Sequence, residues 1–138
     1  MESKEQILAL IKSDGTPIEC ECFLVKYLFD FNCAPHVVDG RTVFELGRND
    51  VGLPVVVDPS SGHVSFVCKG KLRFSNSSFS QLLRAFAFVR EWPVPDDLPD
   101  AHRAKIFEKR MLDIDENSFQ DPDAGWSDIR DEIKYGVV

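Results

Sequence analysis

The chain has no long hydrophobic segment among its 138 residues. Its wholly apolar stretches, such as Val55–Val57 and Ala85–Val89, are far shorter than the roughly 20 residues that a membrane-spanning helix needs. The first residues, Met1–Glu5, are polar and of mixed charge, whereas a secretory signal begins with basic residues and continues into a longer apolar run. We therefore expect a cytoplasmic protein without membrane association.

The chain also lacks an excess of basic residues, because its net charge is −7 and its pI is about 4.9. Nucleic acids and anionic membranes attract basic surfaces, so neither is an expected partner. Residues 91–138 carry 13 acidic and 6 basic side chains, whereas residues 1–90 carry 10 of each. The net charge thus belongs to the last third of the chain, which is either a solvated helical face or a docking surface for a basic partner.

Recognised catalytic and cofactor motifs are missing too. The sequence has no G-x-G-x-x-G or P-loop pattern, and Ser60-Ser61-Gly62 lacks the preceding glycine of a nucleophile elbow. The three histidines, His36, His63 and His102, have no Cys, His or carboxylate neighbour at a metal-binding or nucleophile spacing. Acidic pairs such as Asp96-Asp97 fall at expected helix boundaries, where capping explains them. We expect no enzyme activity, no metal ion and no cofactor.

Cysteine is scarce, with four residues at positions 20, 22, 33 and 68. The thiols of the Cys20-x-Cys22 pair would share one face of a strand, but Cys33, His36 and Cys68 do not add the closely spaced ligands of a zinc site. We interpret the cysteines as reduced, buried, small hydrophobic residues. The alternative is a redox enzyme that uses Cys20 and Cys22, although redox pairs are usually C-x-x-C at the start of a helix, where the thiol pKa is lowered.

The composition of the chain, with 43% hydrophobic and 28% charged residues, is typical of a globular protein, and its length predicts one domain spanning residues 1–138. Capping boxes at Ser3–Gln6 and Ser78–Gln81 predict a first helix that ends at Asp14-Gly15 and a second helix over residues 79–89. Two later helices are also predicted. One is capped by Asp97, with Ala104, Phe107, Met111 and Leu112 facing inward, and the other begins at Asp123, with Trp126, Ile129 and Ile133 at helical spacing.

The middle of the chain predicts a run of strands. Residues 37–46 surround an Asp39-Gly40 turn, Pro54 opens a strand over Val55–Val57, and residues 63–74 surround a Lys69-Gly70 turn. These connections are too short for parallel crossovers, so the strands form an antiparallel meander. The segment Ile18–Phe31 mixes strand-like alternation with helical spacing, and we interpret it as extended. The expected fold is α+β, a single antiparallel sheet with helices packed around it.

The order of these signals resembles the SUKH superfamily. Phe44–Asp50 followed by Pro54–Val64 is similar to that family's hairpin, an apolar strand followed by Asp-x-x-x-Gly-x-Val. Phe74–Leu83 resembles its Asn-Ser-Ser-Leu-x-x-Phe-Leu entry into the helix after the sheet, with Phe79 in place of the Leu. Trp126 and Gly136 are similar to the C-terminal helix of the same branch. The resemblance covers residues 40–92 well and the tail loosely.

This resemblance implies an α+β domain of SUKH type with no cofactor and no catalytic residue. Many bacterial members look like immunity proteins, which bind and neutralise polymorphic toxins such as nucleases or deaminases, and others are scaffold-like regulators. We therefore expect a cytoplasmic immunity protein that occludes a toxin's active site, because an acidic inhibitor is steered towards a basic cleft. The candidate partner-binding residues are Asp96, Asp97, Asp100, Asp113, Asp115, Glu116, Asp121 and Asp123.

One other binding function fits the same composition. A type III-like secretion chaperone, or another small acidic adaptor, would also be a small acidic α+β protein. A chaperone predicts a stable homodimer with a large apolar groove, whereas an immunity protein predicts a toxin partner. The sequence leaves the identity and activity of the partner open.

Overall fold

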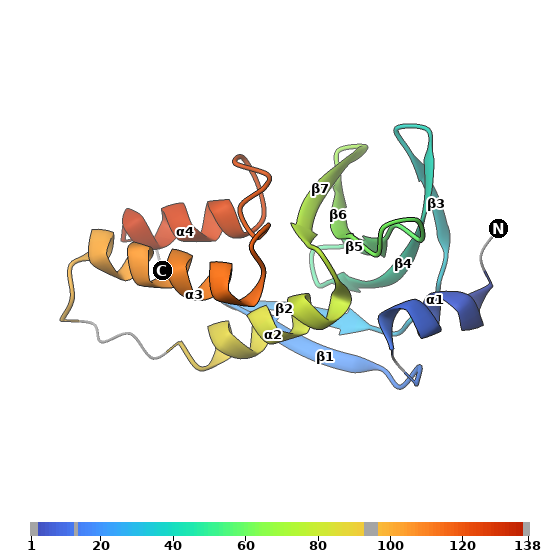
Figure 1. Cartoon of the computed structure of the whole chain (residues 1–138), viewed down its shortest axis with the longest axis horizontal. Coiled ribbons are helices and arrows are strands. Elements are labelled where there is room, and N and C mark those ends of the chain that lie inside the picture. The colour runs from blue at the N-terminus through green and yellow to red at the C-terminus, as the bar shows by residue number, and fades with distance from the viewer. Residues whose placement is uncertain (1–2, 13, 93–96, 137–138) are drawn as a thin grey trace.

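The computed structural model describes residues 3–12, 14–92 and 97–136 (Figure 1). These residues form an α+β fold with one antiparallel sheet of seven strands and four helices, which confirms the predicted fold class. In chain order the elements are α1 (Lys4–Ile11), β1 (Ile18–Cys22), β2 (Val25–Phe29), β3 (Pro35–Val38), β4 (Arg41–Asn49), β5 (Pro54–Val57), β6 (Val64–Cys68), β7 (Lys71–Asn76), α2 (Phe79–Arg90), α3 (Asp100–Ile114) and α4 (Trp126–Lys134). No helix within the described ranges has the length and hydropathy to cross a membrane.

The sheet has the strand order β1-β2-β4-β5-β6-β7, and β3 pairs with β4 beside this path. The meander prediction holds from β3 to β7, where each strand pairs with the next strand of the chain. Pro54 stands at the first residue of β5, where its missing N–H does least harm to the ladder. The sheet departs from a simple meander at β4, because β3 pairs with Arg41–Phe44 and β2 pairs with Arg48 and Asn49.

A glycine allows β2 to approach β4 closely. A Cβ atom on Gly47 would overlap the carbonyl oxygen of Leu28 and would lie 2.6 Å from Cα of Phe29. The register between β4 and β5 also shifts between Glu45 and Gly47, as at a β-bulge. Only glycine fits such a contact between two backbones, so Gly47 sets where the β1–β2 hairpin crosses the rest of the sheet.

The segment Ile18–Phe31 is extended, as interpreted, and its first part forms the β1–β2 hairpin. The turn residues Phe23 and Leu24 have φ angles of 46° and 74°, which is the backbone of a type I′ turn without the usual Asn or Gly. Phe23 packs against the core, while Leu24 is 86% exposed. The apparent helical spacing in the sequence therefore comes from a turn built of apolar residues.

The first two helices start where their caps predict. Ser3 and Gln6 exchange both hydrogen bonds of a capping box, at 2.7 and 3.2 Å. The second box is only half formed, because Ser78 Oγ accepts from the Gln81 N–H but donates its own proton to Gln81 Oε1. The first helix does not run to Asp14-Gly15: it ends at Ile11, and Lys12 takes the left-handed conformation that closes it.

The boundaries of the last two helices differ from the prediction. Asp97 does not cap α3, because the N-cap is Pro99. A proline disfavours helical conformation in the residue before it, so the helix does not begin earlier. Leu112 is 41% exposed, since it lies about 100° around the helix from the buried Met111. The final helix begins at Trp126 instead of Asp123, after a Gly125 N-cap with a φ of 63°. Ala104, Phe107 and Met111 are buried, as predicted.

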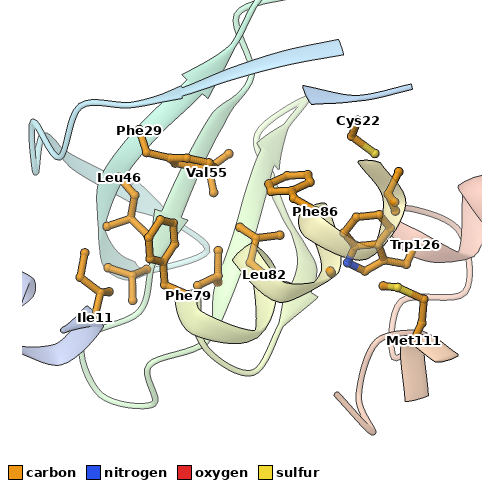
Figure 2. Packing of buried hydrophobic residues seen from close by; sticks show 14 of the residues in the cluster. Ile11, Cys22, Phe29, Leu46, Val55, Phe79, Leu82, Phe86, Met111 and Trp126 are labelled. Carbon is orange, nitrogen blue, oxygen red and sulfur yellow. The ribbon is translucent and has the colours of Figure 1, made fainter. Parts of the chain in front are cut away.

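The helices and the sheet share one main core. Side chains from α1, β2, β4, β5, α2, α3 and α4 meet there, as Figure 2 shows for Phe29, Phe86 and Trp126. Helix α2 lies beside the β1–β2 hairpin, and α3 and α4 form a separate layer (Figure 1). Aromatic rings join these layers, since Phe86 lies 5.8 Å from Trp126 between ring centroids and 4.8 Å from Tyr27. A small second cluster of Val38, Val43 and Val56 packs with Val67 and Leu72.

Candidate functional site

The structure does not bring all of the predicted acidic residues together. Asp96 lies outside the described residues. Asp97 is exposed, and Asp100 is half-exposed and pairs with Arg103 at 3.6 Å at the start of α3. Asp113 and Glu116 are exposed at the other end of this helix, which is about 21 Å away at 1.5 Å per residue. The predicted residues therefore occupy at least two separate places.

Asp115 is part of the interior, with 2% of its surface exposed. Its carboxylate accepts hydrogen bonds from the N–H of Ser77 (2.7 Å), the hydroxyl of Ser77 (2.8 Å), Nδ2 of Asn76 (3.1 Å) and the N–H of Asn117 (3.0 Å). Burial opposes the charge, but these hydrogen bonds outweigh it and hold the pKa of Asp115 below its usual value. Asp115 thus fastens the end of α3 to the β7–α2 junction and presents no charge to a partner.

Four carboxylates gather where the chain enters α4, and we call Asp121, Asp123, Asp128 and Asp131 the α4 acidic cluster. Asp121 pairs with Arg73 on β7, with Nη1 and Oδ2 3.3 Å apart. Burial raises the pKa of Asp128, and the charges of Asp131, Asp121 and Asp123 raise it further, while Arg73 lowers it. The cluster therefore joins two predicted residues, Asp121 and Asp123, to two residues that the sequence reasoning did not select.

A groove of about 470 Å³ lies between the β6–β7 hairpin and the N-terminal end of α4. We call it the β7–α4 groove. Its apolar lining includes Tyr27, Phe66, Phe86, Trp126 and Ile129. One wall carries the basic side chains of Lys69, Lys71 and Arg73, and the other carries the carboxylates of Asp123 and Asp128. An apolar groove with a few charged groups at its walls is the usual form of a binding site.

Strand register explains how β6 and β7 supply one wall. Phe66 pairs with Arg73 and Cys68 pairs with Lys71, so these four side chains share one face of the sheet. The intervening pair, Val67 and Leu72, points to the opposite face and packs against the second hydrophobic cluster. The alternation along this hairpin therefore separates the groove-facing set from the pair that packs against the second hydrophobic cluster.

Tyr27 and Cys22, two polar groups that line the groove, are neutral at physiological pH. Burial, together with the nearby Cys22 thiol, raises the pKa of Tyr27 to about 12. Burial, together with Glu132, raises the pKa of Cys22 to about 12, and burial also raises the pKa of Cys20. All four cysteines carry free thiols, and Cys22 is buried. A thiol in this environment is a poor nucleophile, which argues against the redox alternative for Cys20 and Cys22.

A second polar group of residues surrounds Glu45 on β4, which is 3% exposed. Arg48 donates to both of its carboxylate oxygens, at 2.9 and 3.1 Å. His36 Nε2 lies 2.9 Å from Oε1, and Asn32 donates to Oε2 at 2.7 Å. Burial opposes the charge, but these contacts hold the pKa of Glu45 below its usual value. The carboxylate is fully engaged, so this arrangement fastens β3 and the segment before it to β4.

Within the described ranges, no group of three His, Cys, Asp or Glu side chains is placed to hold a metal ion. Comparison with protein-family models, with curated proteins and with solved structures gives no match.

The β7–α4 groove is the feature that sequence reasoning missed. The alternation along residues 66–73 and the helical spacing of Trp126 and Ile129 were both visible in the sequence. Each pattern describes one wall of the groove. Neither pattern shows that the two walls, which are about 50 residues apart in the chain, face each other.

Proposed function

We propose that the chain is a non-enzymatic, protein-binding domain of SUKH type, which acts in the cytoplasm and neutralises a toxin by covering its active site. The α4 acidic cluster is the observation that carries this proposal. Burial raises the pKa of Asp128, and the neighbouring carboxylates raise it further, although Arg73 pairs with Asp121 and Arg130 pairs with Asp131. A basic partner relieves the repulsion between these carboxylates, and complementary charge also speeds the encounter of two proteins.

Other acidic residues extend the proposed surface. Asp113 and Glu116 are exposed at the end of α3, immediately before the loop that carries Asp121 and Asp123. A toxin that acts on nucleic acid has a basic cleft for phosphate, so this surface would compete with its substrate. Asp97 and Asp100, at the far end of α3, belong to the edge of such an interface or lie outside it.

The segments whose sequence resembles the SUKH superfamily form a hairpin and the junction between the sheet and α2 in this fold. Phe44–Asp50 and Pro54–Val64 form the β4–β5 hairpin and the turn into β6. Phe74–Leu83 contains the β7–α2 junction, where Ser77 binds Asp115 and Ser78 caps α2. These are turn and cap roles, so the resemblance supports the kind of fold and leaves the partner to experiment.

A capture experiment tests the proposed function. The tagged protein is used to isolate partners from the native host at low and high salt, and bound proteins are identified by mass spectrometry. We expect one stoichiometric partner that carries a toxic domain and that salt releases, because exposed charges are screened over about 8–10 Å at physiological salt. Absence of such a partner, or binding unaffected by salt, contradicts the proposal.

Charge reversal then tests which surface binds. The triple variant Asp113→Lys, Glu116→Lys, Asp123→Lys reverses the charge of three exposed residues and should lose both toxin binding and its salt dependence. The matched control Glu19→Lys, Glu21→Lys, Asp50→Lys makes the same change of net charge at exposed positions outside α3, α4 and the loop between them. If both triple variants bind the toxin equally well, the acidic surface is not the interface.

The secretion-chaperone alternative uses a different feature, the apolar lining of the β7–α4 groove. It predicts a stable homodimer and capture of the unfolded N-terminal segment of a secreted protein. Light scattering separates the two functions, because a monomer at micromolar concentration contradicts the chaperone and agrees with the immunity protein.

A further inference from the structure

We propose that the β7–α4 groove binds an extended segment of the partner protein, in which an aromatic side chain lies between an acidic and a basic residue. The aromatic side chain enters the groove, the acidic residue faces Lys69 and Lys71, and the basic residue faces Asp123 and Asp128. This inference rests on the proposed function, since it names the part of the toxin that this surface would recognise.

The lining of the groove can accept a ring. Tyr27 and Phe66 are only half-buried, and their centroids lie 6.0 Å apart with the planes tilted by 56°. Phe86 lies 4.8 Å from Tyr27 and 5.8 Å from Trp126, so the bottom of the groove is a continuous aromatic surface. The volume of about 470 Å³ exceeds that of one side chain and lies within the range of ordinary ligand sites. Aromatic residues are the most frequent anchors in pockets of this kind.

The two walls carry opposite charges, which decides what flanks the ring. Lys69 and Lys71 are exposed, at the turn and at the first residue of β7. Across the groove, Asp128 has the other carboxylates of the α4 acidic cluster as neighbours, and Arg73 is paired with Asp121. A segment with one charge of each sign complements both walls, whereas a segment with two like charges is repelled by one of them.

The position of β7 favours a peptide over a compact ligand. β7 is the last strand of the sheet, so in the described ranges it pairs with β6 on one side and with no strand on the other. A free strand edge offers backbone donors and acceptors to an extended segment. Gly125 lies against this edge near Phe74, since a Cβ atom at Gly125 would be 3.3 Å from the Phe74 carbonyl oxygen. The Lys71–Arg73 end is therefore the part that an incoming segment would reach.

The test uses four synthetic tripeptides with acetylated and amidated ends, Glu-Trp-Arg, Gln-Trp-Arg, Glu-Trp-Gln and Gln-Trp-Gln. Binding to the labelled protein is followed by NMR through the indole N–H of Trp126 and the backbone amides of Cys68 and Gly125. We expect Glu-Trp-Arg to bind most tightly and Gln-Trp-Gln most weakly, with about two- to fivefold for each charge, as for exposed ion pairs. Equal affinities for the four peptides, or no shift at the groove, overturn the inference.

Two variants assign each charge to its wall. Asp128→Asn should abolish the advantage of peptides that contain Arg and keep the advantage of those that contain Glu, and Lys71→Gln should do the reverse. Glu21→Gln, at an exposed position of β1, is the control and should change neither. If Asp128→Asn lowers the affinity of all four peptides equally, the Asp128 carboxylate does not recognise the basic residue and the assignment is wrong.

A third variant tests the aromatic anchor. Cys68→Tyr fills the groove from β6 and should abolish binding of Glu-Trp-Arg, whereas Val37→Tyr adds the same ring at a position that is 75% exposed and outside the groove. Thermal unfolding of both variants checks that each is folded. If the wild-type protein forms a dimer whose interface covers Trp126, the groove belongs to a second copy and the inference is wrong.

These outcomes are independent of the toxin experiments. If the peptides do not bind but the protein still forms a salt-sensitive complex with the toxin, the proposal for the groove is wrong and the proposal for the acidic surface stands. Peptide binding without any toxin partner disproves the immunity function and leaves a peptide-binding domain.

Discussion

The indole Nε1 of Trp126 donates a hydrogen bond to Oδ1 of Asn76 at 2.9 Å, although the two residues are 50 positions apart. Both side chains are buried, and Nδ2 of the same Asn76 donates to Asp115 at 3.1 Å. One amide therefore connects the last residue of β7 to the end of α3 and to the first residue of α4. These contacts hold the α3–α4 layer against the sheet, and with it one wall of the β7–α4 groove.

Asn76→Ala should lower the free energy of unfolding by about 2–3 kcal/mol, because it leaves a buried indole N–H and a buried carboxylate oxygen each without one partner. Urea denaturation followed by fluorescence measures the effect. Asn117→Ala is the matched control: its side chain donates to Ser77 Oγ in a half-buried place, and we expect a loss below about 1 kcal/mol. Equal losses of unfolding free energy in the two variants would show that the Asn76 contacts stabilise the protein no more than the half-buried contact of Asn117 does.

The stability of the protein should fall in acid through Asp115. Its pKa in the folded state lies below the usual value of 3.8, so the folded state binds its proton less readily than the unfolded state does. The stabilisation is complete above that usual value and is lost as the pH falls through the lower, folded pKa. Asp115→Asn should therefore be less stable at pH 7 and should show a flatter dependence of the unfolding free energy between about pH 5 and pH 2.

Urea midpoints measured in steps from pH 7 to the acid limit check this prediction. Glu45→Gln should behave in the same way, because the pKa of Glu45 is also lowered. A slope for Asp115→Asn that equals the wild-type slope would mean that Asp115 does not contribute to acid unfolding.

Gly47→Ala should prevent normal folding or cost more than about 3 kcal/mol, because the new Cβ would overlap backbone atoms of Leu28 and Phe29 that cannot move away as a side chain can. The control is Gly40→Asn, at a turn with a φ of 75° and open space, where asparagine tolerates the left-handed conformation. Circular dichroism and thermal unfolding compare the variants. A Gly47→Ala protein of wild-type stability would disprove the close crossing of β2 and β4.

The strands were predictable from the sequence wherever their turns had local signals. Asp39-Gly40 and Lys69-Gly70 have positive φ angles at both residues, and each connects neighbouring strands as expected. The β1–β2 hairpin was ambiguous because its turn uses Phe23 and Leu24, whose conformation depends on packing with distant residues. The helix starts at Asp97 and Asp123 were wrong because Pro99 and Gly125 form the actual boundaries.

The candidate site was less predictable than the fold, because a sequence gives charge and not burial. Asp115 was grouped with surface acids, yet its partners Asn76 and Ser77 come from the junction of β7 and α2, about 40 residues earlier. Asp121 and Asp123 were selected, whereas Asp128 and Asp131 belong with them through the first turns of α4. Both the burial of Asp115 and the composition of the α4 acidic cluster depend on contacts between segments that are distant in the sequence. No local sequence pattern indicates such contacts.

The Cys22 thiol should be the slowest of the β1 cysteines to react with an alkylating agent. It is 4% exposed, and burial with the charge of Glu132 raises its pKa to about 12, whereas Cys20 is only half-buried. Only the thiolate reacts, so we expect Cys22 to be modified on unfolding and not in the native state at pH 8. Peptide mapping after iodoacetamide treatment, with and without urea, measures this modification. In a separate test, the Cys20→Ser, Cys22→Ala double variant should still protect against the toxin. Rapid alkylation of Cys22 in the native state, or loss of protection against the toxin in the folded double variant, would contradict this prediction and support the redox alternative.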